Sequence, residues 1–341
     1  MTTQTPQLQP LERTAWNTAQ LVRDYPPQWT HPNKQALFDH INAIDQAHVK
    51  HGNANNACEI TYARWPATAL PLALAPQAAF IIQPDVFTYN HAHMEVAAPT
   101  TTTHWHMNFA DTNLFCAYAG PLFAQDELQV AEHPALASLL EALIATGKST
   151  TTMNANNSAT PITISGVPRR CGIDTQPNVA AGCAYGLYGN HFQRAAAAHI
   201  IRATTVFTPP TISNILALAA PGYQSGRYTL EQIHSITSTA YSGYLSALLH
   251  QASAPRAIIH TGFWGCGAFG GNRNVMVVLQ ALAANLAGVD IVFHAVNVDG
   301  ARQAQAAHEQ FAQMMRRGAS PSAVIELVHA AHFEWDASDG N

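Results

Sequence analysis

The last third of the chain alternates strand-like and helical segments in a regular order. Strand-like runs at 211–219, 257–261 and 290–298 are interleaved with helical patterns at 229–251, 273–287 and 301–316. Such alternation indicates right-handed crossovers between strands and a sheet whose faces are covered by helices. The sequence therefore predicts an α/β fold.

The first half of the chain is less regular. An amphipathic helix is predicted over 34–49, because Leu37, Phe38, Ile41 and Ile44 share one face, and a shorter helix over 10–24. Several proline and alanine residues between 66 and 76 resemble a connection. We therefore expect a helical accessory segment at 1–75 and a second domain, which holds any functional site, at 76–341. Within that domain we expect a strand at 79–83, a helix at 134–146 and a long polar loop at 147–180.

Charge and composition restrict the class of partner. Only 11% of the residues are charged, the net charge is −5, and the chain has three lysines, Lys34, Lys50 and Lys148. Binding to nucleic acid or to an anionic membrane needs a basic surface, so neither partner is expected. No apolar run reaches the roughly 18 residues of a membrane span, and the five cysteines include no C-x-x-C pair. We expect a soluble cytoplasmic protein, or one exported by a specialised secretion system.

The most informative local motif joins the strand at 257–261 to the helix at 273–287. Five glycines fall within the ten residues from Gly262 to Gly271, where a ligand can approach the backbone closely. Because a helix N-terminus follows, the loop is a candidate phosphate or diphosphate site, although a tight turn with packing glycines would read the same way. No Lys-Ser/Thr follows, which excludes a P-loop. Gly265, Gly267 and Gly270 match G-x-G-x-x-G. A complete dinucleotide-binding fold is not expected, because the sequence has no acidic residue at the required spacing and too few residues after the next strand.

The same loop, TGFWGCGAFGG from Thr261 to Gly271, resembles the diphosphate loop of the poly(ADP-ribose) glycohydrolases. That family writes TGNWGCGAFGG, so the chain departs only at Phe263. The run MNFAD at 107–111 resembles the family's VDFAN, and QDE at 125–127 resembles its QEE at the same spacing of seventeen residues. AYSGY at 240–244 and the tyrosine loop at 184–189 add to a resemblance that spans residues 100–315.

Four departures from the family pattern concern the ribose region. The family's aspartate is Asn108 here, its glycine triplet is the run 115–117 (Phe-Cys-Ala), the first glutamate of its pair is Asp126, and its ribose phenylalanine falls at Val296. The resemblance together with these departures favours removal of single ADP-ribose units, for example from arginine as some bacterial effectors do, over cleavage of poly(ADP-ribose).

The resemblance implies a macrodomain-like mixed sheet flanked by helices, and an enzyme that hydrolyses the glycosidic bond of ADP-ribosylated protein without any cofactor. Its partner would be the ADP-ribose moiety of the modified protein. The residues implied as catalytic are Glu127, Asp126 and Asp111. The residues implied as ligand-binding are Asn108, Gln125, Tyr185, Tyr188, Gly262, Phe263, Trp264, Gly265, Cys266, Gly267, Ala268, Phe269, Gly270, Gly271 and Asn272.

The chemistry of such a reaction needs a proton donor for the leaving group beside an oxocarbenium-like centre. Asp126 and Glu127 are adjacent, so they point in different directions, and one can orient a ribose hydroxyl while the other acts as the acid. Asp111 or Asp126 could instead bind a guanidinium leaving group. The alternative interpretation is that the run 125–127 is a solvated loop before the leucine-rich helix.

Two other functions stay open at this point. Cys266 lies between glycines near a helix N-terminus, where a lowered pKa would suit a cysteine-dependent hydrolase. A non-catalytic ADP-ribose-binding module would need the glycine loop but no acid. The pairs His91/His93 (followed by Glu95) and His104/His106 have metal-ligand spacing, yet among eighteen histidines such spacing arises by chance, and no metal is expected.

Overall fold

The computed structural model describes residues 8–50, 58–73, 78–86, 89, 102–220, 222, 224–250 and 256–340, with side chains in the α2 helix described as far as residue 45. The candidate metal residues His91, His93 and Glu95 and the side chain of Lys50 lie outside this description.

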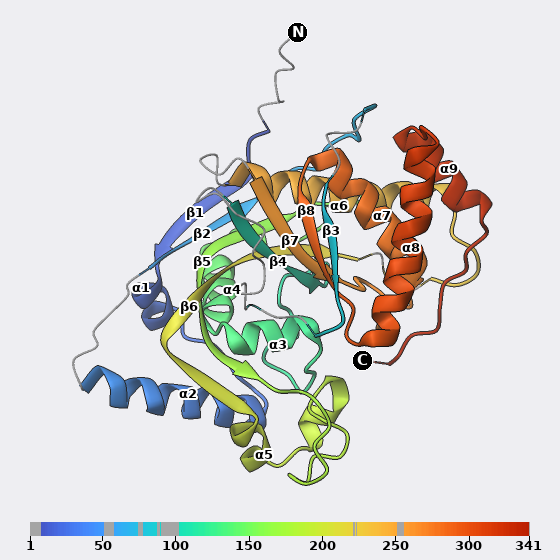
Figure 1. Cartoon of the computed structure of the whole chain (residues 1–341). Helices are drawn as coiled ribbons and strands as arrows, with labels where there is room; N and C mark the ends of the chain where they lie inside the picture. Colours follow the sequence, from blue (N-terminus) through green and yellow to red (C-terminus); the bar gives the residue numbers. More distant parts are fainter. Residues whose placement is uncertain are drawn as a thin grey trace.

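The described residues form an eight-stranded mixed sheet with the order β1-β2-β5-β6-β4-β7-β8-β3 (Figure 1). The strands are β1 (Glu12–Asn17), β2 (Glu59–Arg64), β3 (Phe80–Gln83), β4 (Thr102–Ala110), β5 (Ile162–Ile173), β6 (Thr204–Ala219), β7 (Arg256–Gly262) and β8 (Asp290–His294). The run β6-β4-β7-β8-β3 is parallel, and β1, β2 and β5 extend it in antiparallel pairing. The carboxyl ends of β4, β7 and β8 therefore meet at one edge of the sheet.

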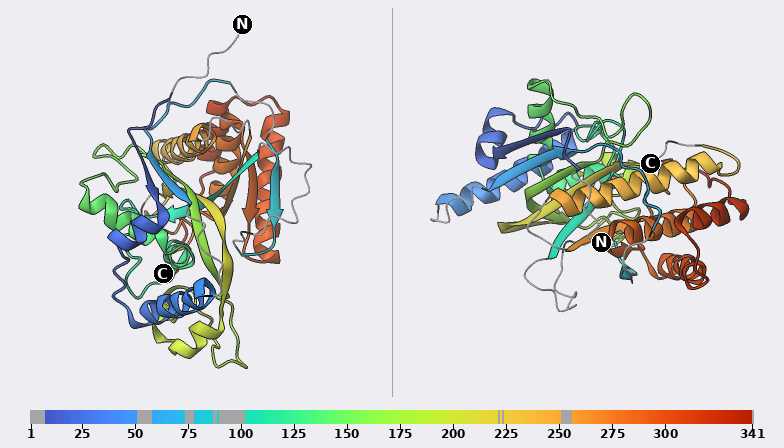
Figure 2. Two further views of the ribbon diagram at one scale, coloured as in Figure 1. Left: turned by 90° about the vertical axis from the view of Figure 1, so that its left-hand side faces the viewer. Right: turned by 90° about the horizontal axis from the view of Figure 1, so that it is seen from above.

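Helices cover both faces of this sheet (Figure 2). They are α1 (Thr18–Asp24), α2 (Pro32–Lys50), α3 (Gln125–Glu132), α4 (Ala135–Ala145), α5 (Ala197–Arg202), α6 (Leu230–His250), α7 (Arg273–Ala287), α8 (Val298–Arg316) and α9 (Pro321–Ala330), with a 3-10 turn η1 (Gly189–Arg194). α6 and α7 pack on one face, and α3 and α4 on the other.

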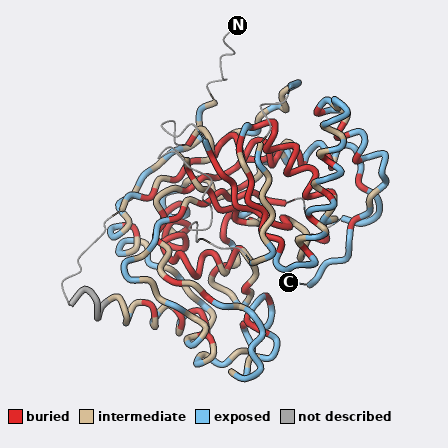
Figure 3. Tube along the Cα trace, in the orientation of Figure 1, coloured by how far each residue is buried: buried red, intermediate tan, exposed pale blue. Residues whose placement is uncertain are grey.

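The alternation of side chains along β4 explains these two layers. Trp105 and Met107 point into the core beneath α6 and α7, whereas His106 and Asn108 point to the face that carries α3. Buried residues accordingly concentrate in the strands and in the helices that touch them (Figure 3). The face of β4 and β7 that carries α3 therefore holds polar side chains that can react, whereas the face beneath α6 and α7 is an apolar core.

The structure confirms the α/β class and the mixed sheet flanked by helices. The helix expected at 273–287 is α7, and those expected at 34–49, 134–146, 229–251 and 301–316 are α2, α4, α6 and α8, with ends that differ by a few residues. The strands expected at 79–83, 211–219, 257–261 and 290–298 are β3, β6, β7 and β8, but β6 begins earlier, at Thr204, and β8 ends earlier, at His294.

Three expectations about local structure are wrong. The helix predicted over 10–24 is β1 followed by the short α1, because alternating exposure along Glu12–Asn17 suits an edge strand paired with β2. The loop predicted over 147–180 contains the twelve-residue strand β5, whose register shifts between Ile164 and Val167 and again after Arg169 break the alternating pattern. The segment 1–75 is not purely helical, since β2 pairs with β5 and joins the central sheet. The domain boundary after residue 75 stays a prediction.

None of the helices in the described residues has the length and hydrophobicity needed to cross a bilayer.

Candidate active site

Two adjacent carboxylates lie buried in the first turn of α3. The exposed fraction is 8% for Asp126 and 4% for Glu127. Glu127 Oε2 accepts a hydrogen bond of 3.0 Å from the backbone N–H of Ala124, which satisfies one of the free donors at the helix start. The alternative that 125–127 is a solvated loop is therefore wrong.

Asp126 is the member of the pair whose pKa is shifted. Burial, reinforced by the negative charge of Glu127, raises its pKa to about 8. The Asn108 side chain donates a hydrogen bond of 2.9 Å from Nδ2 to Asp126 Oδ1, which favours the ionised form but does not outweigh burial. At neutral pH the pair therefore holds a proton.

Asn108 offers a second polar atom at this point. Its side chain is fully buried, and its Oδ1 accepts no hydrogen bond within the described part of the chain. A buried acceptor without a donor costs free energy, so a ligand hydroxyl that donates to it would be favoured.

Two further predicted residues near the pair, Gln125 and Asp111, already form hydrogen bonds within the protein. Gln125 Oε1 accepts from the N–H of Phe109 at 2.8 Å and its Nε2 donates to the carbonyl of Met107 at 2.9 Å, so this side chain fastens α3 to the end of β4. Asp111 Oδ1 accepts from Thr112 Oγ1 and from the N–H of Asn113, both at 3.0 Å, in the turn after β4. Asp111 still lies close enough for its charge to act on Asp126.

The glycine loop begins where β7 ends, beside the end of β4. Gly265 and Gly270 have positive φ angles of 72° and 63°, and these turns expose several N–H groups. Among the described residues, the N–H groups of Gly265, Gly267, Ala268 and Phe269 donate to no protein oxygen. The loop can therefore bind an anion through its backbone.

The large side chains of the loop serve the core instead of a ligand. Trp264 is fully buried and donates from Nε1 to the carbonyl of Leu218 at 3.1 Å, and Phe263 packs against Phe293. Asn272 caps α7, because its Oδ1 accepts from the N–H groups of Asn274 and Val275. Any part that these three residues take in ligand binding falls to their backbone.

Cys266 is half-buried in the same loop. Burial raises the pKa of its thiol well above the ordinary value, so the thiol stays protonated at neutral pH. Its Sγ lies 3.6 Å from the carbonyl oxygen of Trp264. This environment is the opposite of the one that activates a nucleophilic cysteine.

The two tyrosines of the loop at 184–189 lie in different places. Tyr185 is 77% exposed and stacks on His191 with 5.4 Å between ring centres. Tyr188 is 41% exposed and lies near the start of α3, and partial burial with the nearby charge of Asp339 raises its pKa to about 12. Tyr185 is thus free to stack on a base, whereas Tyr188 lies beside the carboxylates.

The C-terminal residues cross the glycine loop, which the sequence did not suggest. The N–H of Asp336 donates to the carbonyl of Gly270 at 2.8 Å, and a carboxylate oxygen of Asp339 lies 3.0 Å from the position that a Cβ on Gly267 would take. Asn190 Nδ2 donates to the carbonyl of Gly340 at 3.0 Å. This segment, 334–340, connects the glycine loop with η1.

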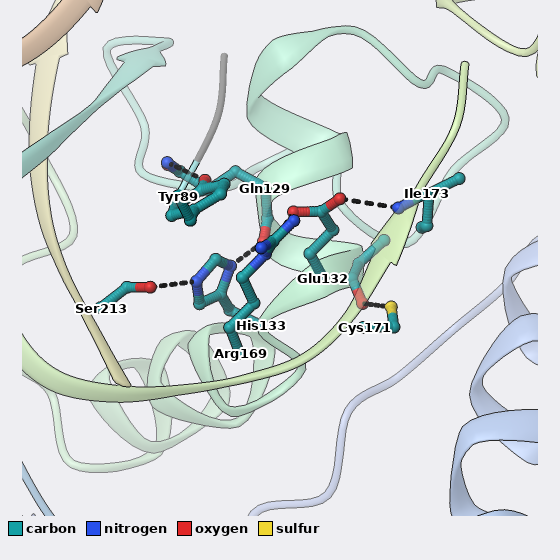
Figure 4. A network of polar contacts seen from close by, with 9 residues as sticks. Tyr89, Gln129, Glu132, His133, Arg169, Cys171, Ile173 and Ser213 are labelled. Carbon is teal, nitrogen blue, oxygen red and sulfur yellow. Dashed lines mark hydrogen bonds and ion pairs between the residues drawn. The ribbon is translucent and has the colours of Figure 1, made fainter. Parts of the chain in front are cut away.

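A polar network behind the pair holds the other end of α3 (Figure 4). Glu132 accepts from Arg169 Nε at 2.9 Å and from the N–H of Ile173 at 2.9 Å, which ties α3 to β5. His133 links its Nε2 to Ser213 Oγ on β6 at 3.0 Å. Arg169 is therefore a structural residue, and Arg170, which pairs with Asp45, is one as well.

The histidines of β4, β7 and β8 form a row of side chains that contact one another. Nδ1 of His104 lies 2.9 Å from Nε2 of His260, Nδ1 of His260 lies 3.2 Å from Nε2 of His294, and His294 Nδ1 lies 2.9 Å from Asp85. The first two links join ring nitrogens of histidines on neighbouring strands, and the third joins a histidine to the carboxylate of Asp85. No three described His, Cys, Asp or Glu residues are placed to hold a metal ion.

Two departures from the family pattern coincide with unusual backbone. Phe115 (φ 53°), fully buried, and Val296 (φ 69°) adopt left-handed conformations that glycine accepts most easily. At Phe115 the chain keeps a turn of the glycine type with a large side chain, and that side chain packs inward under the loop before α3.

Comparison with known proteins supplies the decisive observation. Residues 180–303 match the family model described as poly (ADP-ribose) glycohydrolase (PARG), macro domain fold. This segment is similar to the macro domain of that family. The match agrees, over residues 180–303, with the family resemblance that the sequence predicts. The matched segment includes the tyrosine loop and the glycine loop, whereas the carboxylate pair lies before it.

Solved bacterial PARG structures are similar at low identity. The enzyme from Thermomonospora curvata is 15% identical, with 86% of this chain and 97% of that chain covered and a TM-score of 0.44. Its complex with the inhibitor ADP-HPD is 15% identical, with 86% of this chain and 97% of that chain covered and a TM-score of 0.43. PARG from Deinococcus radiodurans in complex with ADP-ribose is 13% identical, with 89% and 94% covered and a TM-score of 0.41. These superpositions are loose, so the similarity to the PARG family rests on the family model that matches residues 180–303.

Proposed function

We propose that this chain is an ADP-ribosyl glycohydrolase that releases ADP-ribose from ADP-ribosylated protein. The observation that carries the proposal is the carboxylate pair of Asp126 and Glu127, which is buried, holds a proton at neutral pH and lies at the sheet edge where the glycine loop begins. Raised pKa values of this kind are a property of carboxyl groups that act as acids near neutral pH.

The reaction can be written with these groups. The bond between the anomeric carbon of the ribose and the acceptor atom breaks, and the acceptor takes the proton held by Asp126 and Glu127. Water adds its hydroxyl to the anomeric carbon and leaves its proton on the pair, which restores the starting state. Positioned acid catalysis of this kind contributes roughly 10²–10⁴-fold.

The remaining parts of the ligand fit the groups around the pair. The free N–H groups of Gly265, Gly267, Ala268 and Phe269 would bind the diphosphate, and exposed Tyr185 would stack on the adenine. The unpaired Oδ1 of Asn108 would accept from a ribose hydroxyl.

The preference for single ADP-ribose units on arginine is part of this proposal. The buried Phe115 and its neighbours replace the family's glycine triplet, which changes the loop beside the distal ribose. Asp111, partly exposed after β4, would attract a guanidinium leaving group. Export as an effector, and the choice between the cytoplasm and a host cytosol, stay predictions from the sequence.

A non-catalytic ADP-ribose reader is the second candidate, favoured by one observation. Asn108 stands where the family has an aspartate, so one acidic group fewer is present at the ribose. A cysteine-dependent hydrolase has less support, because burial keeps the Cys266 thiol protonated.

The test compares release of ADP-ribose from protein modified on arginine, protein modified on serine, and poly(ADP-ribose). Release from the arginine-linked substrate above the other two supports the full proposal, and release only from poly(ADP-ribose) overturns the preference. Absence of release together with tight ADP-ribose binding in calorimetry would make the chain a reader. Absence of both would refute the proposal.

A further inference from the structure

Lys34 is a buried lysine in the first turn of α2, and only 1% of it is exposed. Its Nζ donates to the carbonyl of Tyr118 at 2.5 Å and lies 5.8 Å from the centre of the Phe123 ring. Both contacts belong to the segment between β4 and α3. The lysine therefore comes from the N-terminal part of the chain and enters the region just before the carboxylate pair.

One carbonyl does not compensate a buried ammonium group. Removing a lysine charge from water costs several kcal/mol unless an opposite charge offsets it. The charges of Glu127 and Asp126 both favour the protonated form of Lys34, although burial still lowers its pKa to about 8. Reciprocally, Lys34 is the one cation in the described residues whose charge acts on Asp126.

The surroundings of α2 make this placement firm. The N–H groups of Thr30 and His31 donate to the carbonyl of Ala119 at 3.1 and 3.0 Å. Asn33 Nδ2 donates to the carbonyls of Phe192 and Ala195, both at 2.9 Å. The start of α2 is thus fixed both to the loop before α3 and to the turn η1.

We propose that Lys34 is a positioning residue of the active site, which offsets the charge of the Asp126–Glu127 pair and holds the preceding loop through Tyr118. This inference rests on the proposed function for its catalytic meaning, but the charge coupling itself exists without catalysis. The N-terminal segment then contributes to the ionisation of the site as well as to the sheet.

Other groups near the pair are accounted for in the same way. Asp111 adds negative charge from the turn after β4, and Asn108 donates from β4. Cys116 and Tyr188 are neutral near pH 7, because burial raises the pKa of the former to about 11 and of the latter to about 12. His31 lies on the other side of Lys34, and burial together with the lysine charge lowers its pKa. Among the described groups whose charges act on Asp126, Lys34 is the positive one.

The small number of lysines allows a direct test. Protein labelled with ¹³C at the lysine ε-carbon contains three labelled residues, Lys34, Lys50 and Lys148, and Lys34→Met identifies the signal of interest. In the Asp126→Asn/Glu127→Gln double variant, the titration midpoint of Lys34 should fall by about one pH unit or more, which is about tenfold in proton affinity. The Lys148 signal of the same samples serves as the internal control and should not move. An unchanged Lys34 midpoint overturns the proposal, whether or not the chain hydrolyses ADP-ribose.

The catalytic consequence is measured separately in the pH profile of ADP-ribose release. Lys34→Met should move the profile to higher pH by about one unit, because Asp126 holds its proton more tightly without the cation. Lys34→Arg should keep the wild-type position, and Lys148→Met is the matched surface control. A lower rate of release at every pH, with the pH midpoint of the profile unchanged, would show that Lys34 has only a structural role. If the wild type releases nothing, the proposed function fails and the lysine titration still decides the inference.

Discussion

The substitution Asp126→Asn should stabilise the fold at neutral and alkaline pH. The carboxyl of Asp126 has a pKa of about 8 in the fold against an ordinary value of 3.8. Between these values the unfolded chain loses this proton while the native protein keeps it, so stability falls as the pH rises from about 4 to 8. At 1.36 kcal/mol for each pKa unit, the buried Asp126 carboxyl lowers the free energy of unfolding at pH 7 by at most about 4 kcal/mol.

Asparagine removes this burden and keeps an oxygen that can accept from Asn108 Nδ2. Because local rearrangement reduces the cost of burying the charge, we expect a gain of about 2 kcal/mol in the free energy of unfolding at pH 8, and less than about 1 kcal/mol at pH 4.5. Urea unfolding of both proteins at the two pH values measures the difference. Asp111→Asn, in the turn after β4, is the matched control and should change stability by less than about 0.5 kcal/mol. A loss of stability at pH 8, or an equal gain at both pH values, would refute the reasoning.

Three further predictions concern the glycine loop. Gly262→Ala would place a Cβ 2.7 Å from the carbonyl oxygen of His294, so β7 and β8 must move apart. We expect the free energy of unfolding to fall by about 1–3 kcal/mol and ADP-ribose to bind more weakly in calorimetry. Unchanged affinity would contradict this prediction. Cys266→Ser should keep activity within about threefold, whereas a cysteine nucleophile would require a complete loss. Asp339→Asn removes a carboxylate beside Gly267 and should tighten ADP-ribose binding about threefold at low salt; weaker binding would show that Asp339 does not compete with the diphosphate.

The features that the sequence predicts well are those with strong local patterns. α7 follows a loop whose glycines end the strand and is capped by Asn272, so both its start and its end at Gly288 are readable. The carboxylates of α3 were found through their spacing from Asn108, and the structure brings these residues together. Local pattern thus located the glycine loop and the strands β3, β6, β7 and β8, and the family resemblance located the carboxylate pair. The central strand β4 was not predicted.

The features that the sequence did not predict depend on long-range contacts. β5 contains Gly166, Pro168 and two arginines and is bulged twice, so its place in the sheet is fixed by neighbours from distant parts of the chain. Lys34 has the sequence context of an ordinary surface lysine on an amphipathic helix, and only folding brings it to the segment before α3. Asp339 likewise reaches Gly267 only through the course of the C-terminal segment.

The variant Glu127→Gln tests the central claim, that the buried pair performs the hydrolysis, most directly. Glutamine keeps an oxygen that can accept from the N–H of Ala124, so α3 should start as before and the variant should fold normally. The measurement is ADP-ribose release from arginine-modified protein by wild type, Glu127→Gln and Asp126→Asn, with ADP-ribose affinity determined by calorimetry in parallel. We predict that release falls by about 10²-fold or more in Glu127→Gln while affinity changes little. Wild-type release by both folded variants would contradict the account.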